Sequence, residues 1–259
     1  MSFDGVAAAS YDSFMGRYST PLASLFAASA RLPETGRVLD VGSGPGALTG
    51  VLAARYGVAN VAAVDPADAF VAALRSRLPG VDARVASAES LPFPDDAFDA
   101  ALAALVVHFM ADPHRGVGEL VRVTRPGGAV AACVWDFAGG RAPQSLFFGA
   151  LRDVARDVDD ETDRTGARGG DLPALLRAAG CVEVRETELT VEVPYPGFDD
   201  WWQPYTLGVS PAGRQLAALD PGDRDRVRSL CRDRLPSGPV VVSAKAWSAS
   251  GIVPSSGRG

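Results

Sequence analysis

A short apolar strand that runs straight into a glycine-rich turn is the sequence feature that most limits how this chain can fold. Residues 38–46 read VLDVGSGPG, and the ten residues that follow, ALTGVLAARY, have the composition of a helix. Gly42, Gly44 and Gly46 carry no side chains, so positive φ angles cost little and a ligand can approach the backbone closely. The turn leads to the exposed N–H groups at the start of the helix. We therefore expect a strand–turn–helix unit that binds a ligand.

Two acidic residues indicate the kind of ligand. Asp65 closes the next apolar strand, where a carboxylate can bind the two hydroxyls of a ribose. Its alternative role is to cap the helix after Pro66. Asp40 precedes the first glycine by two residues, where a carboxylate would repel a pyrophosphate but suits a cationic ligand with a free amine, such as S-adenosylmethionine (SAM). The alternative for Asp40 is that it only ties down the turn by hydrogen bonds.

Strands and helices alternate along most of the chain, which is typical of an α/β fold with a parallel, doubly wound, Rossmann-like sheet. Apolar segments predict strands over residues 38–41, 61–64, 83–86, 98–107, 129–134, 182–193 and 240–247. The fourth is almost entirely apolar, as a strand covered on both faces should be. A chain of 259 residues with 47% hydrophobic content can bury one large core, so we treat residues 1–259 as a single domain.

Charge and composition argue against several classes of function. The net charge of −6 disfavours a nucleic-acid substrate. The sequence has no apolar run near the ~20 residues that cross a bilayer and no basic segment that would start a signal peptide, so we expect a cytoplasmic protein without a membrane partner. The cysteines, Cys133, Cys181 and Cys231, are too far apart for a disulfide or metal motif, and Asp199 and Asp200 lack further ligands, so we expect no metal.

Four segments resemble the motifs of class I SAM-dependent methyltransferases, in the group that includes ubiquinone/menaquinone-type C-methyltransferases and many small-molecule methyltransferases. The glycine turn resembles the first motif, and AVDP at 63–66 resembles the ribose-binding motif. ASAESLPFPDDAFDA at 86–100 resembles the adenine-binding loop, and ELVRVTRPGGAVAACVW at 119–135 resembles the helix, turn and fifth strand. The resemblance covers roughly residues 11–193. It implies a seven-stranded, mostly parallel sheet with an antiparallel last strand.

The resemblance also implies a set of cofactor-binding residues. Ser87 stands where many relatives have an aspartate that accepts the adenine amino group, and its hydroxyl is a weaker, neutral acceptor. Ala88 would offer its backbone N–H to the adenine ring, and Glu89 follows in the same loop. The full expected set is Tyr11, Arg17, Asp40, Gly42, Gly44, Gly46, Asp65, Pro66, Ser87, Ala88, Glu89, Ala103 and His108.

The segment YDSFMGRYS at 11–19 resembles one found ahead of the glycine motif in some of these enzymes. The resemblance implies that residues 11–31 form a helix that covers the cofactor. Arg17 would then bind the methionine carboxylate with its planar fork. Tyr11 would reach the same carboxylate or the reacting centre. The alternative is that this segment is only the packing face of an amphipathic helix.

His108 follows the fourth predicted strand, near the carboxyl edge of the sheet where ligands of this fold bind. It could act as a general base, because its ordinary pKa is near neutrality. It could equally be a hydrogen-bonded residue that positions its neighbours. Tyr11 is the second candidate for a catalytic role.

Two less regular stretches, about 136–170 and 198–236, read as insertions that form a cap or lid. Trp201, Trp202 and Tyr205 give the second stretch a dense aromatic cluster. Such a cluster could wall a pocket for an organic acceptor, or it could be the packed core of the cap. Residues 248–259 are polar and are expected to fray.

The function that these patterns favour is methyl transfer from SAM to a small, hydrophobic or aromatic metabolite. Oxygen, nitrogen and carbon acceptors all stay open. One alternative is an NAD-dependent oxidoreductase, because Gly42, Gly44 and Ala47 satisfy the loose fingerprint G-x-G-x-x-G/A. The other is a protein that binds SAM without catalysis. The expected partner is the small-molecule acceptor alone.

Overall fold

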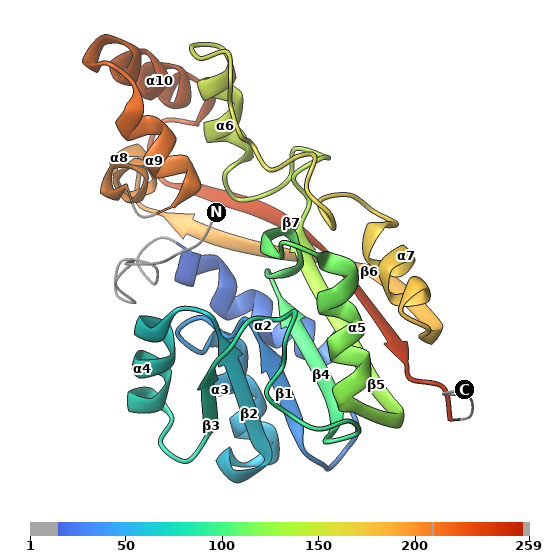
Figure 1. Cartoon of the computed structure of the whole chain (residues 1–259). Helices are drawn as coiled ribbons and strands as arrows, with labels where there is room; N and C mark the ends of the chain where they lie inside the picture. Colours follow the sequence, from blue (N-terminus) through green and yellow to red (C-terminus); the bar gives the residue numbers. More distant parts are fainter. Residues whose placement is uncertain (1–14, 209, 256–259) are drawn as a thin grey trace.

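The computed structural model describes residues 15–208 and 210–255. Within them one sheet has seven strands in the order β3-β2-β1-β4-β5-β7-β6 (Figure 1). Strand β7 is antiparallel to β5 and β6, and the remaining neighbours are parallel. This confirms the predicted doubly wound sheet with an antiparallel last strand. The strands are β1 (Val38–Val41), β2 (Val61–Asp65), β3 (Asp82–Val85), β4 (Phe98–Ala104), β5 (Thr124–Trp135), β6 (Val182–Tyr195) and β7 (Val240–Ile252).

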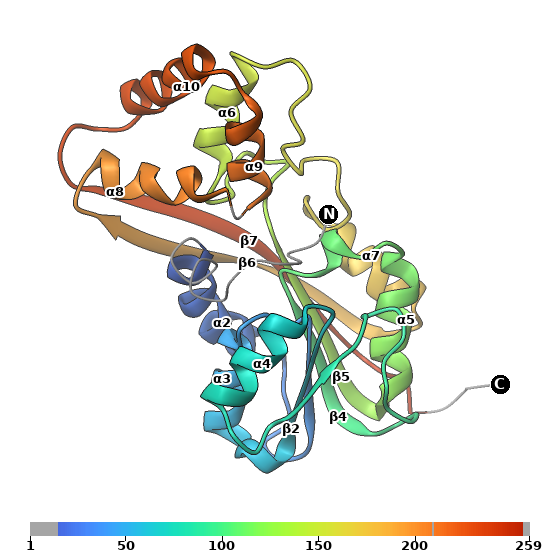
Figure 2. The same cartoon turned by 60° about the vertical axis from the view of Figure 1, so that its left-hand side comes forward.

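Helices cover both faces of the sheet, which is why β1, β2 and β4 are almost wholly apolar and buried. Figure 2 shows α2, α3 and α4 on one side of the parallel strands and α5 and α7 on the other. Short 3-10 turns, η2 and η3, precede β2 and α5. The bounds are α2 (Arg17–Ser29), α3 (Ala47–Tyr56), η2 (Val58–Asn60), α4 (Asp68–Arg77), η3 (Val107–Phe109), α5 (Pro113–Val123) and α7 (Asp171–Ala178).

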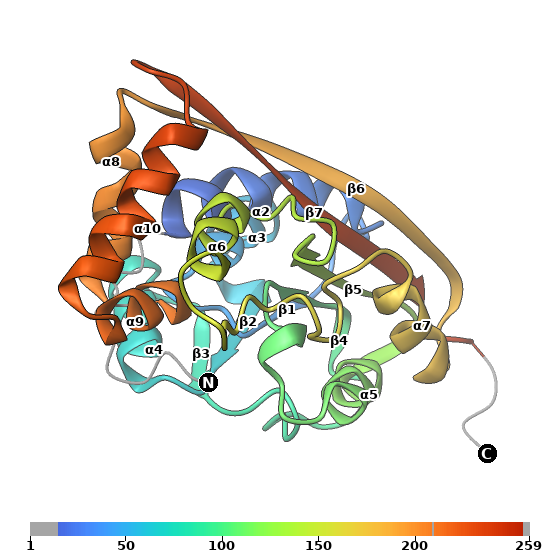
Figure 3. The same cartoon turned by 90° about the horizontal axis from the view of Figure 1, so that it is seen from above.

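The remaining helices form a cap at one end of the long β6–β7 pair (Figure 2). Seen from above, these two strands run past α2 along one side of the molecule, and the cap helices gather at one end (Figure 3). Helix α6 comes from the first predicted insertion and contacts α9 and α10 of the second. The two insertions therefore build one cap layer. Its elements are α6 (Ser145–Arg152), α8 (Phe198–Trp202), η4 (Gln203–Leu207), α9 (Pro211–Ala218) and α10 (Pro221–Arg234).

The last strand is longer than the sequence pattern predicted. It continues past Trp247 to Ile252, so the first part of the expected frayed tail belongs to the sheet. Ser248 and Ser250 are buried and pair with β5. Their hydroxyl groups make these positions look exposed in the sequence, but small side chains fit between two strands and a helix. The Ser248 hydroxyl is 3.0 Å from that of Ser29 in α2.

The fourth strand ends earlier than predicted. Strand β4 stops at Ala104, and Leu105 has a φ of 60°. This left-handed residue turns the chain toward η3. The apolar residues up to Val107 therefore do not extend β4, and Val107 is buried in η3. In the described part of the chain, no helix is long and apolar enough to cross a membrane.

Candidate active site

The glycine turn lies at the carboxyl edge of β1 and is fixed to the neighbouring strand. The N–H groups of Gly42 and Ser43 donate to the carbonyl oxygen of Val64 at 2.7 and 3.0 Å. Gly42 has a φ of 69°, and a Cβ atom there would lie 2.2 Å from a methyl group of Val106. Any side chain at this position would collide with the side chain of Val106, the residue before η3. Only glycine fits.

Asp65 joins the glycine turn to the next helix. Its Oδ2 accepts the N–H of Gly44 at 2.8 Å, and its Oδ1 accepts the N–H of Ala67 at 2.9 Å. The second bond reaches only the residue before α4, which begins at Asp68 and has no side-chain cap, so Asp65 does not cap this helix as the alternative supposed. The first bond holds the turn. Because a carboxylate oxygen has further lone pairs, these two bonds leave the group able to accept ribose hydroxyls as well.

Asp40 is the most deeply buried acid at this edge. It is 1% exposed, and its Oδ2 accepts the Thr49 hydroxyl at 2.6 Å. Its Oδ1 has no hydrogen-bond partner among the described residues. Burial raises the Asp40 pKa to about 7, the Asp65 charge adds to this shift, and the Thr49 hydrogen bond opposes it. A buried acceptor without a partner is costly, so the site suits a ligand that donates to it.

Asp40 lines a small cavity of about 40 Å³. Helix α2 forms one wall, the glycine turn forms another, and the end of β4 closes the third side. Its lining residues are Ser19, Leu22, Ala23, Asp40, Gly42, Ser43, Gly44, Pro45, Ala47, Leu48, Ala104 and Leu105. Helix α2 therefore lines this cavity, whereas residues 11–14 of the expected covering segment lie outside the described residues.

A second, more open pocket lies on the other side of the glycine turn. It has a volume of about 500 Å³ and is formed by the predicted adenine loop, η3 and the start of α5. Gly42 lines both cavities, so the two adjoin at the turn. The lining residues are Gly42, Pro66, Ser87, Ala88, Glu89, Val106, Phe109, Met110, Ala111, Asp112 and Arg115.

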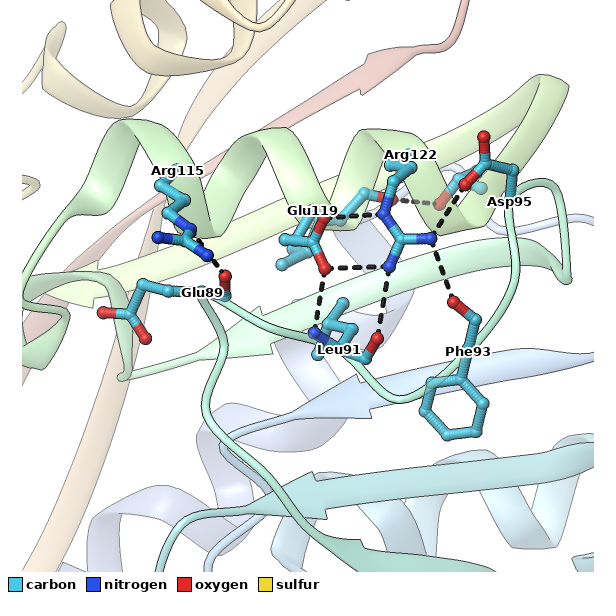
Figure 4. Close-up of polar contacts among 9 residues, drawn as sticks. Glu89, Leu91, Phe93, Asp95, Arg115, Glu119 and Arg122 are labelled. Carbon is cyan, nitrogen blue, oxygen red and sulfur yellow. Dashed lines mark hydrogen bonds and ion pairs between the residues drawn. The ribbon is translucent and has the colours of Figure 1, made fainter.

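Glu89 holds the adenine loop against the start of α5. Its carboxylate accepts the Ser87 hydroxyl and the N–H groups of Ala111 and Asp112, the latter two at 2.8 and 3.4 Å. Burial acts to raise the Glu89 pKa, but these hydrogen bonds outweigh it and the pKa is lowered. Arg115 donates to the Glu89 carbonyl oxygen at 2.9 Å (Figure 4). Glu89 thus shapes the pocket through its neighbours.

Arg122 fixes the rest of this loop. Its guanidinium donates to the carbonyl oxygens of Leu91 and Phe93 at 3.2 and 2.9 Å (Figure 4). The same group bonds to Glu119, whose carboxylate accepts the Leu91 N–H at 2.8 Å. Sequence reasoning did not identify this pair. Its signal was the spacing of three residues on one helix, which brings Glu119 and Arg122 together.

His108 lies in η3 and is covered by the first insertion. Its Nε2 is 3.5 Å from Oε2 of Glu161, and its ring centroid is 4.0 Å from that of Phe109. Burial, helped by the Arg164 charge, lowers the His108 pKa to about 3. Burial raises the Glu161 pKa to about 7. Both shifts favour the neutral forms, so burial favours a contact between a neutral imidazole and a carboxylic acid over an ion pair.

Glu161 was not identified from the sequence, because it lies in an irregular polar stretch without a motif. It is buried and has a φ of 66°, which is uncommon for a residue with a side chain. The surrounding insertion holds it in this conformation. The carboxyl group of Glu161 is thereby directed to His108.

Known proteins support the assignment that this geometry suggests. A family model described as "Methyltransferase domain" matches residues 39–132. Demethylmenaquinone methyltransferase of Clavibacter sepedonicus is 30% identical over 70% of this chain and 76% of its own length. The chain belongs to the family of SAM-dependent methyltransferases.

Two further similarities show how far the likeness extends. The uncharacterized methyltransferase Rv3342 of Mycobacterium tuberculosis is 38% identical, but the match spans only 49% of this chain and 50% of that protein. A SAM-dependent methyltransferase from Thermotoga maritima has a solved structure with a TM-score of 0.55 and 20% identity, covering 94% of this chain and 98% of that one. The second similarity concerns the fold alone.

Most of the residues expected to bind the cofactor of this methyltransferase lie along the two adjoining cavities. Gly46 begins α3 with a φ of 102°. Ala103 differs from the expectation, because it is fully buried inside the sheet, and the next two residues line the cavity instead. Tyr11 lies outside the described residues. The members that line a cavity are Asp40, Gly42, Gly44, Pro66, Ser87, Ala88 and Glu89.

Arg17, expected at the methionine carboxylate, contacts the cap of the methyltransferase. Its guanidinium donates to both carboxylate oxygens of Asp200 at 2.7 and 3.2 Å. It also stacks over the Tyr195 ring at 5.1 Å. The Asp200 hydrogen bond raises the Arg17 pKa. Arg17 therefore links α2 to α8 in this structure.

The aromatic cluster of the second insertion is the core of the cap. Trp201, Trp202 and Tyr205 are buried, and Tyr205 stacks on Phe147 of α6 with ring centroids 4.3 Å apart. They do not line the two cavities at the glycine turn. Short helices must bury their own apolar faces, and this packing corresponds to the second of the two roles given above for the cluster. Trp202 and Tyr205 border a separate cavity between η4, α9 and α10.

Proposed function

We propose that this chain transfers the methyl group of SAM to a small, hydrophobic or aromatic metabolite. The observation that carries the proposal is the buried Asp40 carboxyl group, which lines a cavity adjoining the predicted adenine pocket and has one oxygen without a hydrogen-bond partner among the described residues. A carboxylate at this point favours an amine over a pyrophosphate. The same feature argues against the NAD-dependent alternative.

The residues present fit the parts of SAM. Asp65 would accept the ribose hydroxyls, and Pro66 and Ala88 would enclose the adenine in the open pocket. The Ser87 hydroxyl, already bonded to Glu89, would be the neutral counterpart of the usual aspartate. When bound, the sulfonium supplies an activated methyl group. The protein mainly has to align this group with the acceptor, and alignment of this kind can contribute up to ~7–11 kcal/mol.

Support for an apolar acceptor comes from the aromatic surroundings of His108. The rings of Phe109 and Phe137 lie with their centroids 4.0 and 5.6 Å from the imidazole. An oxygen acceptor needs a base, whereas an amine or an activated carbon needs less help. The buried, neutral His108 is proposed as a positioning residue, held by Glu161 at the floor of the cap. Tyr11 is the remaining candidate for a base.

A methylation screen tests this proposal. Purified protein and SAM would be incubated with small phenols, amines and quinone-type rings, and products would be followed by mass spectrometry. We expect a methylated product and an equal amount of S-adenosylhomocysteine (SAH), both reduced in Asp65→Ala at subsaturating SAM. Tight binding of SAH without any product across the panel would favour the non-catalytic alternative instead.

A further inference from the structure

We infer that Ser19 of α2 and Asp40 together bind the ammonium group at the methionine end of the cofactor. The inference rests on the proposed use of SAM and gives a role to Ser19, which ends the segment at 11–19 but had no role of its own in the sequence analysis. It gives the covering helix a direct part in recognising the charged end of the cofactor.

The first observation is the state of the Ser19 side chain. Ser19 is 8% exposed, and its hydroxyl oxygen is buried without a hydrogen-bond partner among the described residues. A serine inside a helix commonly bonds to a carbonyl oxygen of the preceding turn. The Ser19 hydroxyl does not. A buried hydroxyl without a partner is unfavourable, so a ligand that bonds to it would relieve that cost.

The second observation is that Asp40, which lines the same cavity, also has a buried oxygen without a hydrogen-bond partner among the described residues. Ser19 and Asp40 line one cavity, and Oδ1 of Asp40 also has no partner in the described part of the chain. An ammonium group has several N–H donors and a positive charge. It can donate to both oxygens at once. A carboxylate ligand at the same point would face the Asp40 charge, so the cavity selects the amine.

The third observation is that hydrogen bonds and packing anchor α2, which carries Ser19, to strands β6 and β7. The hydroxyl of Tyr18 is 2.9 Å from that of Tyr195 in β6, and Ser29 bonds to Ser248 in β7. Leu22 and Phe26 are buried against the sheet. A polar group on a packed helix is presented in a fixed geometry, which favours selective binding.

Calorimetry with two ligands tests the inference. One ligand is SAH, and the other is an SAH analogue in which hydrogen replaces the amine. Ser19→Ala should weaken SAH binding about tenfold or more, the range for a hydrogen bond to a charged group. It should leave the affinity for the deaminated analogue unchanged. Ser24→Ala is the matched control, because Ser24 is exposed on the same helix.

The outcomes separate the inference from the function on which it rests. Equal affinity of wild type and Ser19→Ala for SAH would overturn the role of Ser19, and so would an equal loss for both ligands. Wild-type protein that does not bind SAH at all would overturn the proposed function itself. Thermal unfolding of Ser19→Ala and Ser24→Ala checks that each variant is folded.

Discussion

Nε2 of His108 lies 3.5 Å from Oε2 of Glu161, and the two side chains are only 2% and 4% exposed. The histidine comes from the sheet edge beside the proposed cofactor site, and the glutamate comes from the cap. Because burial favours the neutral form of both groups, the folded pair keeps one titratable proton, on Glu161, between the two pKa values of about 3 and about 7. This contact connects the first insertion with the end of β4.

The contact between His108 and Glu161 predicts that the unfolding free energy depends on pH in opposite directions when one or the other residue is replaced. The His108 pKa falls from 6.5 to about 3, so its contribution is lost as pH drops below 6.5. The Glu161 pKa rises from 4.5 to about 7, so its contribution is lost as pH rises from 4.5 through 7. Relative to wild type, Glu161→Gln should lose ~2–3 kcal/mol of unfolding free energy on acidification across this window, and His108→Gln should gain a similar amount.

Urea unfolding at closely spaced pH values measures these slopes. Asp40 also titrates in this range, but its contribution is common to all three proteins and cancels in the comparison. Curves for both variants that run parallel to wild type would mean that His108 and Glu161 keep ordinary pKa values in the folded protein.

Asp40 predicts that SAH binding weakens in acid. Burial raises its pKa to about 7, and an ammonium ligand binds the ionised form. The affinity for SAH should therefore fall by up to about tenfold per pH unit below neutrality. Calorimetry at several pH values checks this. In Asp40→Asn, affinity should be lower and nearly independent of pH, and a variant that keeps the wild-type pH dependence would refute the assignment.

Arg122 predicts that the adenine loop depends on one guanidinium. A lysine there cannot donate to the Leu91 and Phe93 carbonyls and to Glu119 together. Arg122→Lys should lower the unfolding free energy by about 1–3 kcal/mol and weaken SAH binding. The control is Asp95→Ala. Asp95 is 61% exposed, so loss of its ion pair with Arg122 should cost less than about 1 kcal/mol.

Arg17 predicts selectivity for the cofactor's carboxylate. Its pair with Asp200 is 38% and 36% exposed, and such pairs contribute little, so Arg17 can exchange Asp200 for a ligand carboxylate at small cost. Arg17→Lys should weaken SAM binding but not the binding of decarboxylated SAM. If wild-type protein binds both ligands equally well, Arg17 does not have this role.

Local motifs predicted the centre of this fold, because the residues that define it are close in sequence. The glycine turn requires glycine at Gly42 for steric reasons, and the Asp65 carboxylate must follow its strand to reach the turn. The turn and the strand before Asp65 can each be recognised within a short segment, although the contacts that fix them involve Val106 and span the 21 residues between Gly44 and Asp65. The alternation of apolar segments predicted a parallel, doubly wound sheet, and the family resemblance implied its antiparallel last strand, but the order of the strands was not predicted.

Contacts between distant segments explain what the sequence could not predict. Glu161 approaches His108 only through the path of an irregular insertion. Ser248 and Ser250 are polar, and the sequence pattern places them in an exposed tail. In the structure they are buried in β7, where Ser248 contacts Ser29 of α2. Tyr205 of the aromatic cluster stacks on Phe147 of α6, which is distant in the chain, and the sequence does not show this contact.

Calorimetry of the wild-type protein with SAH and with NADH tests the central claim most directly. The account predicts that SAH binds and NADH does not, and that Asp65→Ala weakens SAH binding by roughly 1.5–3 kcal/mol, the range for hydrogen bonds to a charged group. Tight binding of NADH without binding of SAH would contradict it.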